Sequence, residues 1–339
     1  MRWDNLSVER ERGAALPGFK EPAVVRTFDA PEALGTRFYE VRARSAINEV
    51  PKRSRMPFRY TINPYRGCSH ACVYCFARPT HTYLDFNARE DFEREIVVKV
   101  NAPELVRAEL ARPSWNGDHV ALGTNTDPYQ WVEGRYELMQ GIWEAMRDFA
   151  NPCSVLTKSP LLLRDVGLMK EIAERTDFTA NLSIPTLDEK AWRQTEPHTP
   201  HPRKRIEAVA ELKRAGIRTG VLIAPLIPGV NDSPEQVAPL LDLLDEAGPD
   251  SVGGVALHLR GEVREIWFDW LREHRPDLLP RYEELYERGA YMRKDEAGRL
   301  AAMVRRPGRD GPRRGIRARP DAERAEELSP PPERQPTLF

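Results

Sequence analysis

Three of the four cysteines in this chain of 339 residues fall within eight positions of one another, at Cys68, Cys72 and Cys75. They form a CxxxCxxC run in the stretch NPYRGCSHACVYCFAR, directly after Gly67. The N-terminus lacks the apolar segment of a secretory signal, and no run approaches the roughly 18 apolar residues of a membrane helix, so we expect a cytoplasmic protein. In a reducing compartment, clustered cysteines bind metal or carry out chemistry more often than they form disulfides. The chain is therefore expected to hold a metal site at this loop.

Two kinds of metal centre suit this spacing. Three thiolates can hold three irons of a cubane iron-sulfur cluster and leave the fourth iron open to an outside ligand. A structural zinc ion would want four ligands, and His70 or His81 could complete a set of three cysteines and one histidine. The spacing alone leaves both readings open. Cys153 opens the apolar stretch CSVLTKS and is predicted to be a buried thiol on a strand.

Short apolar runs alternate with amphipathic segments along most of the chain, which predicts an α/β protein with parallel strands. Helical spacing is clearest at 137–150 and 203–216, and the second of these ends at a glycine stop. Periodicity alone does not separate a barrel from a doubly wound sheet. The six predicted strands are 58–66, 119–127, 153–159, 178–186, 218–226 and 251–259.

The stretch NPYRGCSHACVYCFAR resembles the cluster loop of radical S-adenosylmethionine (radical SAM) enzymes, in the branch that includes spore photoproduct lyase. The resemblance implies a partial (β/α)6 barrel with a [4Fe-4S] cluster on Cys68, Cys72 and Cys75. It also implies that S-adenosyl-L-methionine (AdoMet) binds at the open iron and is cleaved reductively to methionine and a 5′-deoxyadenosyl radical. An electron donor such as flavodoxin or ferredoxin would be a partner.

The same resemblance implies which residues contact AdoMet, at the ends of the barrel strands where such folds place their chemistry. The loop after the second strand would bind its amino group, although Asp127 before Pro128 is also a common turn pattern. Lys158 could pair with a carboxylate or simply be solvated, and relatives approach the adenine at 224–232. The residues predicted to bind the cofactor are Tyr74, which would cover the adenine, Thr124, Asn125, Thr126, Asp127, Lys158 and Ser183, which would contact the ribose.

One departure from the branch concerns the catalytic hydrogen donor. Spore photoproduct lyase carries a cysteine near the second-strand loop that returns a hydrogen atom to the product radical, whereas the corresponding stretch here reads GTNTD. This difference weakens repair of the spore photoproduct as the activity and leaves the catalytic residue unassigned. Tyr74, Tyr129 or Cys153 are candidate substitutes, and His198 and His201 occupy a proline-rich loop expected near the barrel mouth.

The chain is predicted to divide into four parts. Residues 1–45 form an N-terminal extension that caps the pocket, 46–260 the core barrel, and 261–303 a helical segment with a break at Arg275 and Pro276. Residues 304–339 form an Arg/Pro-rich tail, which is expected to be disordered because it cannot bury enough apolar surface to fold.

The tail suggests partners. It carries seven arginines and one aspartate between Arg305 and Arg319, a composition that can hold phosphates of nucleic acid, although the whole chain has a net charge of only -1. Its last five residues, QPTLF, resemble the pentapeptide by which bacterial repair and replication proteins bind the sliding clamp. Gln335, Leu338 and Phe339 would be the contacts.

The sequence therefore predicts a radical SAM enzyme that repairs or modifies nucleic acid. Two alternatives remain at this point. One is a nucleic-acid-binding module in which zinc staples the cysteine loop. The other is a radical SAM enzyme that acts on a small molecule or a protein and carries an incidental tail.

Overall fold

The computed structural model describes residues 8–14, 16–52, 54 and 56–305 of the 339-residue chain. The arginine-rich tail beyond Arg305 and the terminal QPTLF lie outside the described residues. The predictions of a disordered tail, of phosphate binding by it and of a sliding-clamp contact therefore stay predictions.

The larger of two sheets has seven strands in the order β12-β11-β10-β9-β8-β5-β4. Six of them pair in parallel, and β4 (Ile47–Glu49) adds an antiparallel edge to β5. This arrangement confirms the predicted partial (β/α)6 barrel. The parallel strands are β5 (Tyr60–Ile62), β8 (Val120–Leu122), β9 (Cys153–Thr157), β10 (Phe178–Ser183), β11 (Thr219–Leu226) and β12 (Ser251–Ala256).

The predicted first strand, 58–66, is divided in the structure. β5 ends at Ile62, and a second short strand, β6 (Tyr65–Arg66), joins the smaller sheet instead. Pro64 lies between them and has no N–H to donate to a ladder, which favours a break at this point. The division carries the chain from the barrel into the cysteine loop.

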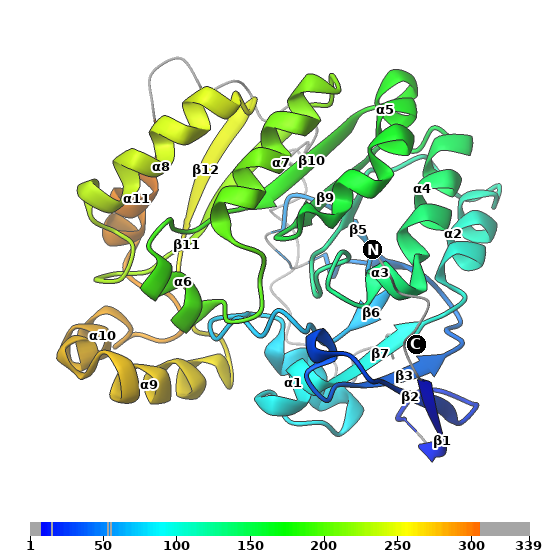
Figure 1. Cartoon of the computed structure of the whole chain (residues 1–339), viewed down its shortest axis with the longest axis horizontal. Coiled ribbons are helices and arrows are strands. Elements are labelled where there is room, and N and C mark those ends of the chain that lie inside the picture. The colour runs from blue at the N-terminus through cyan, green and yellow to red at the C-terminus, as the bar shows by residue number, and fades with distance from the viewer. Residues whose placement is uncertain (1–7, 15, 53, 55, 306–339) are drawn as a thin grey trace.

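Helices cover the outer side of the larger sheet, following one another across it in Figure 1. In α4, the residues Met139, Ile142, Trp143 and Met146 are fully buried, at the i, i+3, i+4, i+7 spacing of an apolar helix face. The predicted helices at 137–150 and 203–216 are thereby confirmed. The covering helices are α2 (Ala102–Leu110), α4 (Leu138–Asp148), α5 (Val166–Arg175), α7 (Pro202–Arg214) and α8 (Pro234–Ala247).

The smaller sheet has the order β1-β2-β3-β7-β6 and lies beside the barrel in Figure 1. The N-terminal extension supplies three of its strands, and β3 pairs in parallel with β7. The extension is thus built into a sheet shared with residues of the predicted core, and the domain boundaries stay a prediction. The strands are β1 (Val8–Ala14), β2 (Ala23–Phe28), β3 (Arg37–Val41) and β7 (Glu95–Lys99).

The C-terminal segment contains the two predicted helices, and the break falls where expected, since α9 ends at His274 before Arg275 and Pro276. Within the described ranges, no helix is both long enough and apolar enough to cross a bilayer. The remaining helices are α1 (Glu90–Arg94), α3 (Glu133–Tyr136), α6 (Glu189–Thr195), α9 (Val263–His274), α10 (Leu279–Leu285) and α11 (Lys294–Met303), with short 3-10 helices at Pro31–Ala33, Arg78–Leu84, Pro160–Asp165 and Pro276–Leu278.

Gly123 turns the chain out of β8 and into the loop 123–127. Its φ is +83°, and a Cβ at this position would lie 2.0 Å from the backbone oxygen of Leu156. We expect Gly123→Ala to lower the free energy of unfolding by about 2–3 kcal/mol, because both the backbone conformation and the space exclude a side chain. Chemical denaturation measures this change. Gly167→Ala in α5, where a Cβ meets nothing within 4 Å, is the control and should not destabilise the protein.

Candidate functional site

The cysteine loop, residues 67–76, begins directly after β6, the short strand that follows β5 of the barrel. Gly67 has a φ of +81°, and a Cβ there would lie 2.8 Å from Ile96 and 2.9 Å from the backbone oxygen of Phe92. The next residue fixes the loop to the same oxygen, because the Cys68 N–H donates to it at 2.9 Å. Only glycine suits this entry to the loop.

The loop brings the three thiols together. Cys68 and Cys72 are buried, Cys75 is half-buried, and all are free rather than paired in disulfides. Burial, followed by the neighbouring Cys68, raises the pKa of Cys75 to about 11. Burial also raises the pKa of Cys72, and Cys75 and Cys68 add to the effect. A bound metal cation would lower the pKa of these thiols and favour the thiolate form.

Arg78 holds the cysteine loop in place through hydrogen bonds to its backbone. Its side chain is 2% exposed and donates to the backbone oxygens of Cys72 at 2.9 Å and Ala71 at 3.0 Å. It also pairs with Glu93, and its guanidinium lies over the ring of Phe92. The arginine therefore orients the loop backbone that carries the cysteines.

The loop after β8 fastens the cysteine loop from the barrel side. The Thr126 hydroxyl donates to the backbone oxygen of Gly67 at 2.6 Å, and the Gln130 amide donates to the same oxygen at 3.3 Å. The oxygen of the Gln130 amide accepts the backbone N–H of Ser69 at 2.9 Å. Thr126 and Gln130 thus set the position of the first cysteine.

Asp127, predicted to contact AdoMet, is the centre of an internal network. Its carboxylate accepts from the Thr157 hydroxyl at 2.5 Å and from the backbone N–H groups of Tyr129 at 2.9 Å and Lys158 at 2.7 Å. His70 Nδ1 lies 3.3 Å from the same carboxylate. Burial would raise the pKa of Asp127, but His70 and these hydrogen bonds outweigh burial and lower it. Asp127 therefore joins the ends of β8 and β9 to the cysteine loop.

Thr124 and Asn125 lie on the outer part of the same loop. The Thr124 hydroxyl is 3.3 Å from the amide of Asn63, and the backbone N–H of Asn125 donates to that amide at 3.0 Å. The Asn125 side chain is exposed and has no hydrogen bond within the described part of the chain. Of the four predicted residues here, Asn125 has the side chain most available to a ligand, and its binding role stays a prediction.

One carboxylate that was not predicted to belong to the site lies at the centre of three predicted residues. These are Tyr74, Lys158 and Ser183. That carboxylate is Glu196, which is fully buried. It accepts a hydrogen bond from the Tyr74 hydroxyl, and the Lys158 ammonium lies 2.6 Å from it. The ammonium also donates to the Ser183 hydroxyl at 2.7 Å. Lys158 is thus paired with a carboxylate, which is one of its two predicted states.

Arg205 completes this buried network. Its guanidinium is fully buried and donates to Glu196 at 2.7 Å, to the Thr199 hydroxyl at 2.5 Å and to the backbone oxygen of Ser183 at 2.9 Å. Burial alone would raise the pKa of Glu196, but the cations of Arg205 and Lys158 outweigh it and lower the pKa to about 2. The carboxylate is therefore ionised, and it joins Tyr74 of the cysteine loop and Lys158 after β9 to α7, close to Cys72.

The histidines considered as fourth zinc ligands have other neighbours. His81 Nε2 lies 2.9 Å from the backbone oxygen of Glu95, and His70 Nδ1 faces Asp127. Among the described residues, no three His, Cys, Asp or Glu side chains converge on one ion position.

The candidate hydrogen donors also have defined positions. Cys153 is fully buried at the start of β9, as predicted, about 13 Å along the strand from Thr157 beside the cysteine loop. The Tyr129 hydroxyl is buried between Asp165 and Trp143. Both residues are fully buried.

A cavity of about 150 Å³ borders the cysteine loop. Ser69 of the loop lines it together with Leu34 and Thr36 of the N-terminal extension and His198 of the proline-rich loop. The N-terminal extension and His198, which is predicted to lie near the barrel mouth, therefore line the same cavity. His201 is instead the N-cap of α7, where Nδ1 accepts the backbone N–H of Arg203 at 3.2 Å.

Sequence reasoning missed Asn63, Arg78, Gln130, Glu196 and Arg205. For Arg205 a signal was present: it lies three, four and seven residues before the apolar Ala208, Val209 and Leu212, on the buried face of α7. Glu196 in TEPHTP had no such signal, because an acid in a proline-rich segment is ordinarily solvated.

Comparisons with known proteins find one family model and several similar proteins. The family model of the Radical SAM superfamily matches residues 62–253. An uncharacterized protein of Mycobacterium tuberculosis is 45% identical over 296 residues, covering 86% of this chain and 87% of that protein. A spore photoproduct lyase complexed with dinucleoside spore photoproduct is similar in fold, with a TM-score of 0.58 and 15% identity over 79% of this chain and 77% of the lyase.

A variant of that lyase with bound AdoMet and dinucleoside spore photoproduct gives a TM-score of 0.56 at 16% identity, covering 78% of this chain and 76% of the variant. The lyase likenesses show a shared fold, and the family match spans the cysteine loop and reaches from the first parallel strand to the sixth. The chain belongs to the radical SAM superfamily and is a radical SAM enzyme.

Proposed function

We propose that this radical SAM enzyme binds a [4Fe-4S] cluster through Cys68, Cys72 and Cys75 and acts on nucleic acid. When bound, the cluster and AdoMet would supply a 5′-deoxyadenosyl radical by reductive cleavage, with an electron from a donor such as flavodoxin or ferredoxin. The observation that carries the proposal is one loop that holds three free thiols, two of them buried, and no disulfide.

The chain's own residues support this role by orienting and shielding the site. Arg78 holds the loop carbonyls, and Thr126 and Gln130 hold Gly67. The buried network around Glu196 keeps Tyr74 and Lys158 in place and excludes water beside Cys72. Asn125, exposed on the loop after β8, is the residue we expect to contact the methionine part of AdoMet.

Nucleic acid is proposed as the substrate class for two reasons. A structure of similar fold is complexed with a dinucleoside photoproduct, and the C-terminal tail has an arginine-rich composition suited to phosphates. The loop 123–127 lacks a thiol. A modification or repair other than that of the spore photoproduct is therefore favoured.

Anaerobic reconstitution tests the proposal. We expect a brown protein with about four irons per chain, and release of 5′-deoxyadenosine when AdoMet and a reductant are added. Damaged and undamaged DNA should change the rate of that release, or alter the products, if nucleic acid is the substrate. Zinc at one per chain in freshly purified protein, without iron uptake, would contradict the cluster.

Unchanged 5′-deoxyadenosine release with every DNA, together with unaltered DNA, would favour a small-molecule or protein substrate instead. A pull-down with the sliding clamp, with and without the last five residues, tests the predicted partner separately. Equal recovery of both chains would remove the support for a clamp contact through Gln335, Leu338 and Phe339.

A further inference from the structure

A second cavity, of about 220 Å³, opens between the N-terminal extension and the edge of the smaller sheet. Five cationic side chains line it against a single carboxylate: Lys20, Arg42, Arg44, Arg66 and Lys99, with Glu21. Because the whole chain has a net charge of -1, this concentration of positive charge is a local feature. None of these residues belongs to the cofactor site described above.

Lys99 is the most informative residue of the cavity. Its side chain is more than nine-tenths buried, and within the described part of the chain its ammonium forms no hydrogen bond or ion pair. Burial and the neighbouring Arg66 lower its pKa to about 8, against an opposing effect of Glu109. An ammonium that borders a cavity and has no carboxylate within hydrogen-bond distance is available to an anionic ligand.

Glu109 does not supply that counter-charge directly. Its carboxylate accepts the backbone N–H groups of Ala46 at 3.1 Å and Ile47 at 2.7 Å. The Asn101 amide likewise exchanges two hydrogen bonds with the backbone of Ala43, at 2.8 and 2.9 Å. The segment between these two attachments is thereby held in place, and it carries Arg44.

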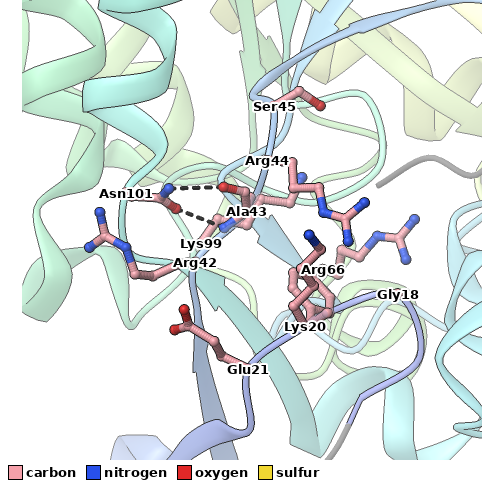
Figure 2. A pocket seen from close by; sticks show the side chains of 11 residues that line it. Gly18, Lys20, Glu21, Arg42, Ala43, Arg44, Ser45, Arg66, Lys99 and Asn101 are labelled. Atoms are coloured by element: carbon pink, nitrogen blue, oxygen red, sulfur yellow. Dashed lines mark hydrogen bonds between the residues drawn. The ribbon is translucent and has the colours of Figure 1, made fainter.

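Figure 2 shows the result. The side chains of Lys20, Arg44 and Arg66 lie close together in this view, and the Asn101–Ala43 hydrogen bonds lie to their left. Arg42 is directed elsewhere, because it pairs with Glu104 at 3.3 Å. Lys20 and Arg44 form no ion pair within the described residues, so they are available to a ligand.

We propose that this cavity binds a phosphate group. Guanidinium forks and ammonium groups that approach from several segments match an oxyanion with three or four acceptor oxygens better than a carboxylate with two. The cavity is smaller than the roughly 300–1,000 Å³ of pockets that take up whole small molecules. It therefore suits one ionic group that projects from a larger ligand, or a free phosphate.

The favoured source is a backbone phosphate of a nucleic-acid strand, an assignment that rests on the proposed function. Arg66 lies on β6, two residues before Cys68. A phosphate bound at Arg66 would therefore lie beside β6, which leads into the cysteine loop. The cavity would then hold the nucleic-acid strand next to the cysteine loop. A free phosphate or a mononucleotide has the same chemistry and is the other source to be tested.

The test uses the full-length reconstituted enzyme and the variants Lys99→Met and Arg44→Gln. Lys170→Gln is the matched control, since this exposed lysine on α5 is outside the cavity. Thermal unfolding is followed in phosphate-free buffer, with inorganic phosphate and with a 5′-mononucleotide. Binding of a fluorescein-labelled single-stranded oligonucleotide is followed by anisotropy over a range of salt concentrations.

Phosphate should raise the Tm of the wild-type protein, because a ligand bound only by the native state stabilises it. Lys99→Met should have a higher Tm than wild type without phosphate and no longer respond to it, a pair of changes that a purely structural lysine would not give. Both cavity variants should bind the oligonucleotide about 10- to 100-fold more weakly, with a salt slope reduced by about 1.

Two results distinguish a nucleic-acid strand from a small phosphate ligand as the source of the phosphate. Oligonucleotide binding that is weakened by both variants and competed by phosphate identifies the strand. A phosphate-dependent Tm that requires Lys99, with oligonucleotide binding equal in all variants, identifies a small phosphate ligand and overturns the strand assignment. If phosphate, mononucleotide and oligonucleotide affect Lys99→Met and wild type equally, the phosphate site itself is wrong. Release of 5′-deoxyadenosine without DNA, measured in parallel, tests the proposed function independently.

Discussion

Replacing Cys72 with alanine is expected to abolish iron binding and reduce 5′-deoxyadenosine formation to background. The thiol is buried within the cysteine loop, and each of the three cysteines would hold a different iron, so loss of one leaves the cluster without its full set of ligands. Alanine removes one atom from the side chain and keeps the loop backbone, whose carbonyl still accepts from Arg78. Iron analysis and visible absorbance after anaerobic reconstitution measure the effect.

Cys153→Ala is the matched control for this experiment. This thiol is also buried, but it lies at the start of β9, away from the loop. The control should keep about four irons per chain and the far-ultraviolet circular dichroism of the wild type. Equal iron content in Cys72→Ala and the wild type would show that the loop does not hold the metal.

The second large effect is expected at Arg205. Arg205→Met should lower the free energy of unfolding by about 3–5 kcal/mol, because removal of one partner leaves a buried carboxylate with too little positive charge around it. Glu196 and the guanidinium are both fully buried and 2.7 Å apart, so solvent does not replace the lost contact. Denaturant unfolding followed by circular dichroism measures the change.

Arg203→Met provides the control on the same helix. Arg203 is exposed, two residues away, and its replacement should change the free energy of unfolding by less than about 0.5 kcal/mol. The double variant Arg205→Met with Glu196→Gln should be less destabilised than the sum of the two single variants, since the two groups interact directly. Strict additivity would contradict a coupled buried pair.

The sequence predicted the parallel strands well because they are short and apolar, and parallel strands read as continuous apolar runs. The closure of these strands into a partial barrel came from the resemblance to a known family. The sequence did not predict the strands of the smaller sheet. The N-terminal segment carries weak periodicity, yet its β3 pairs with β7, 58 residues further along the chain, and β2 and β1 add to β3 in turn. Strand formation there depends on the partner more than on local preference.

The site divides in the same way. The spacing of Cys68, Cys72 and Cys75, together with the resemblance of the surrounding stretch, is enough to identify the loop. The roles of Asp127 and Thr126 required the fold, because a polar residue after a strand can either face a ligand or hold a neighbouring loop. The hydrogen bonds show that Thr126 holds the cysteine loop at Gly67 and that Asp127 holds the backbone of Lys158 after β9, while contact of either side chain with AdoMet stays a prediction.

The amino-acid sequence by itself determined the α/β class and the loop that carries the three thiols, because these follow from local patterns of apolar residues and cysteines, and the resemblance of that loop to a known family added the partial barrel. Only the tertiary structure decided that Glu196 and Arg205 form an ion pair close to Cys72. It also decided that Lys99 lines a cavity with four other cationic side chains. Burial and charge pairing join residues distant in the chain, and no local pattern records which of them will meet.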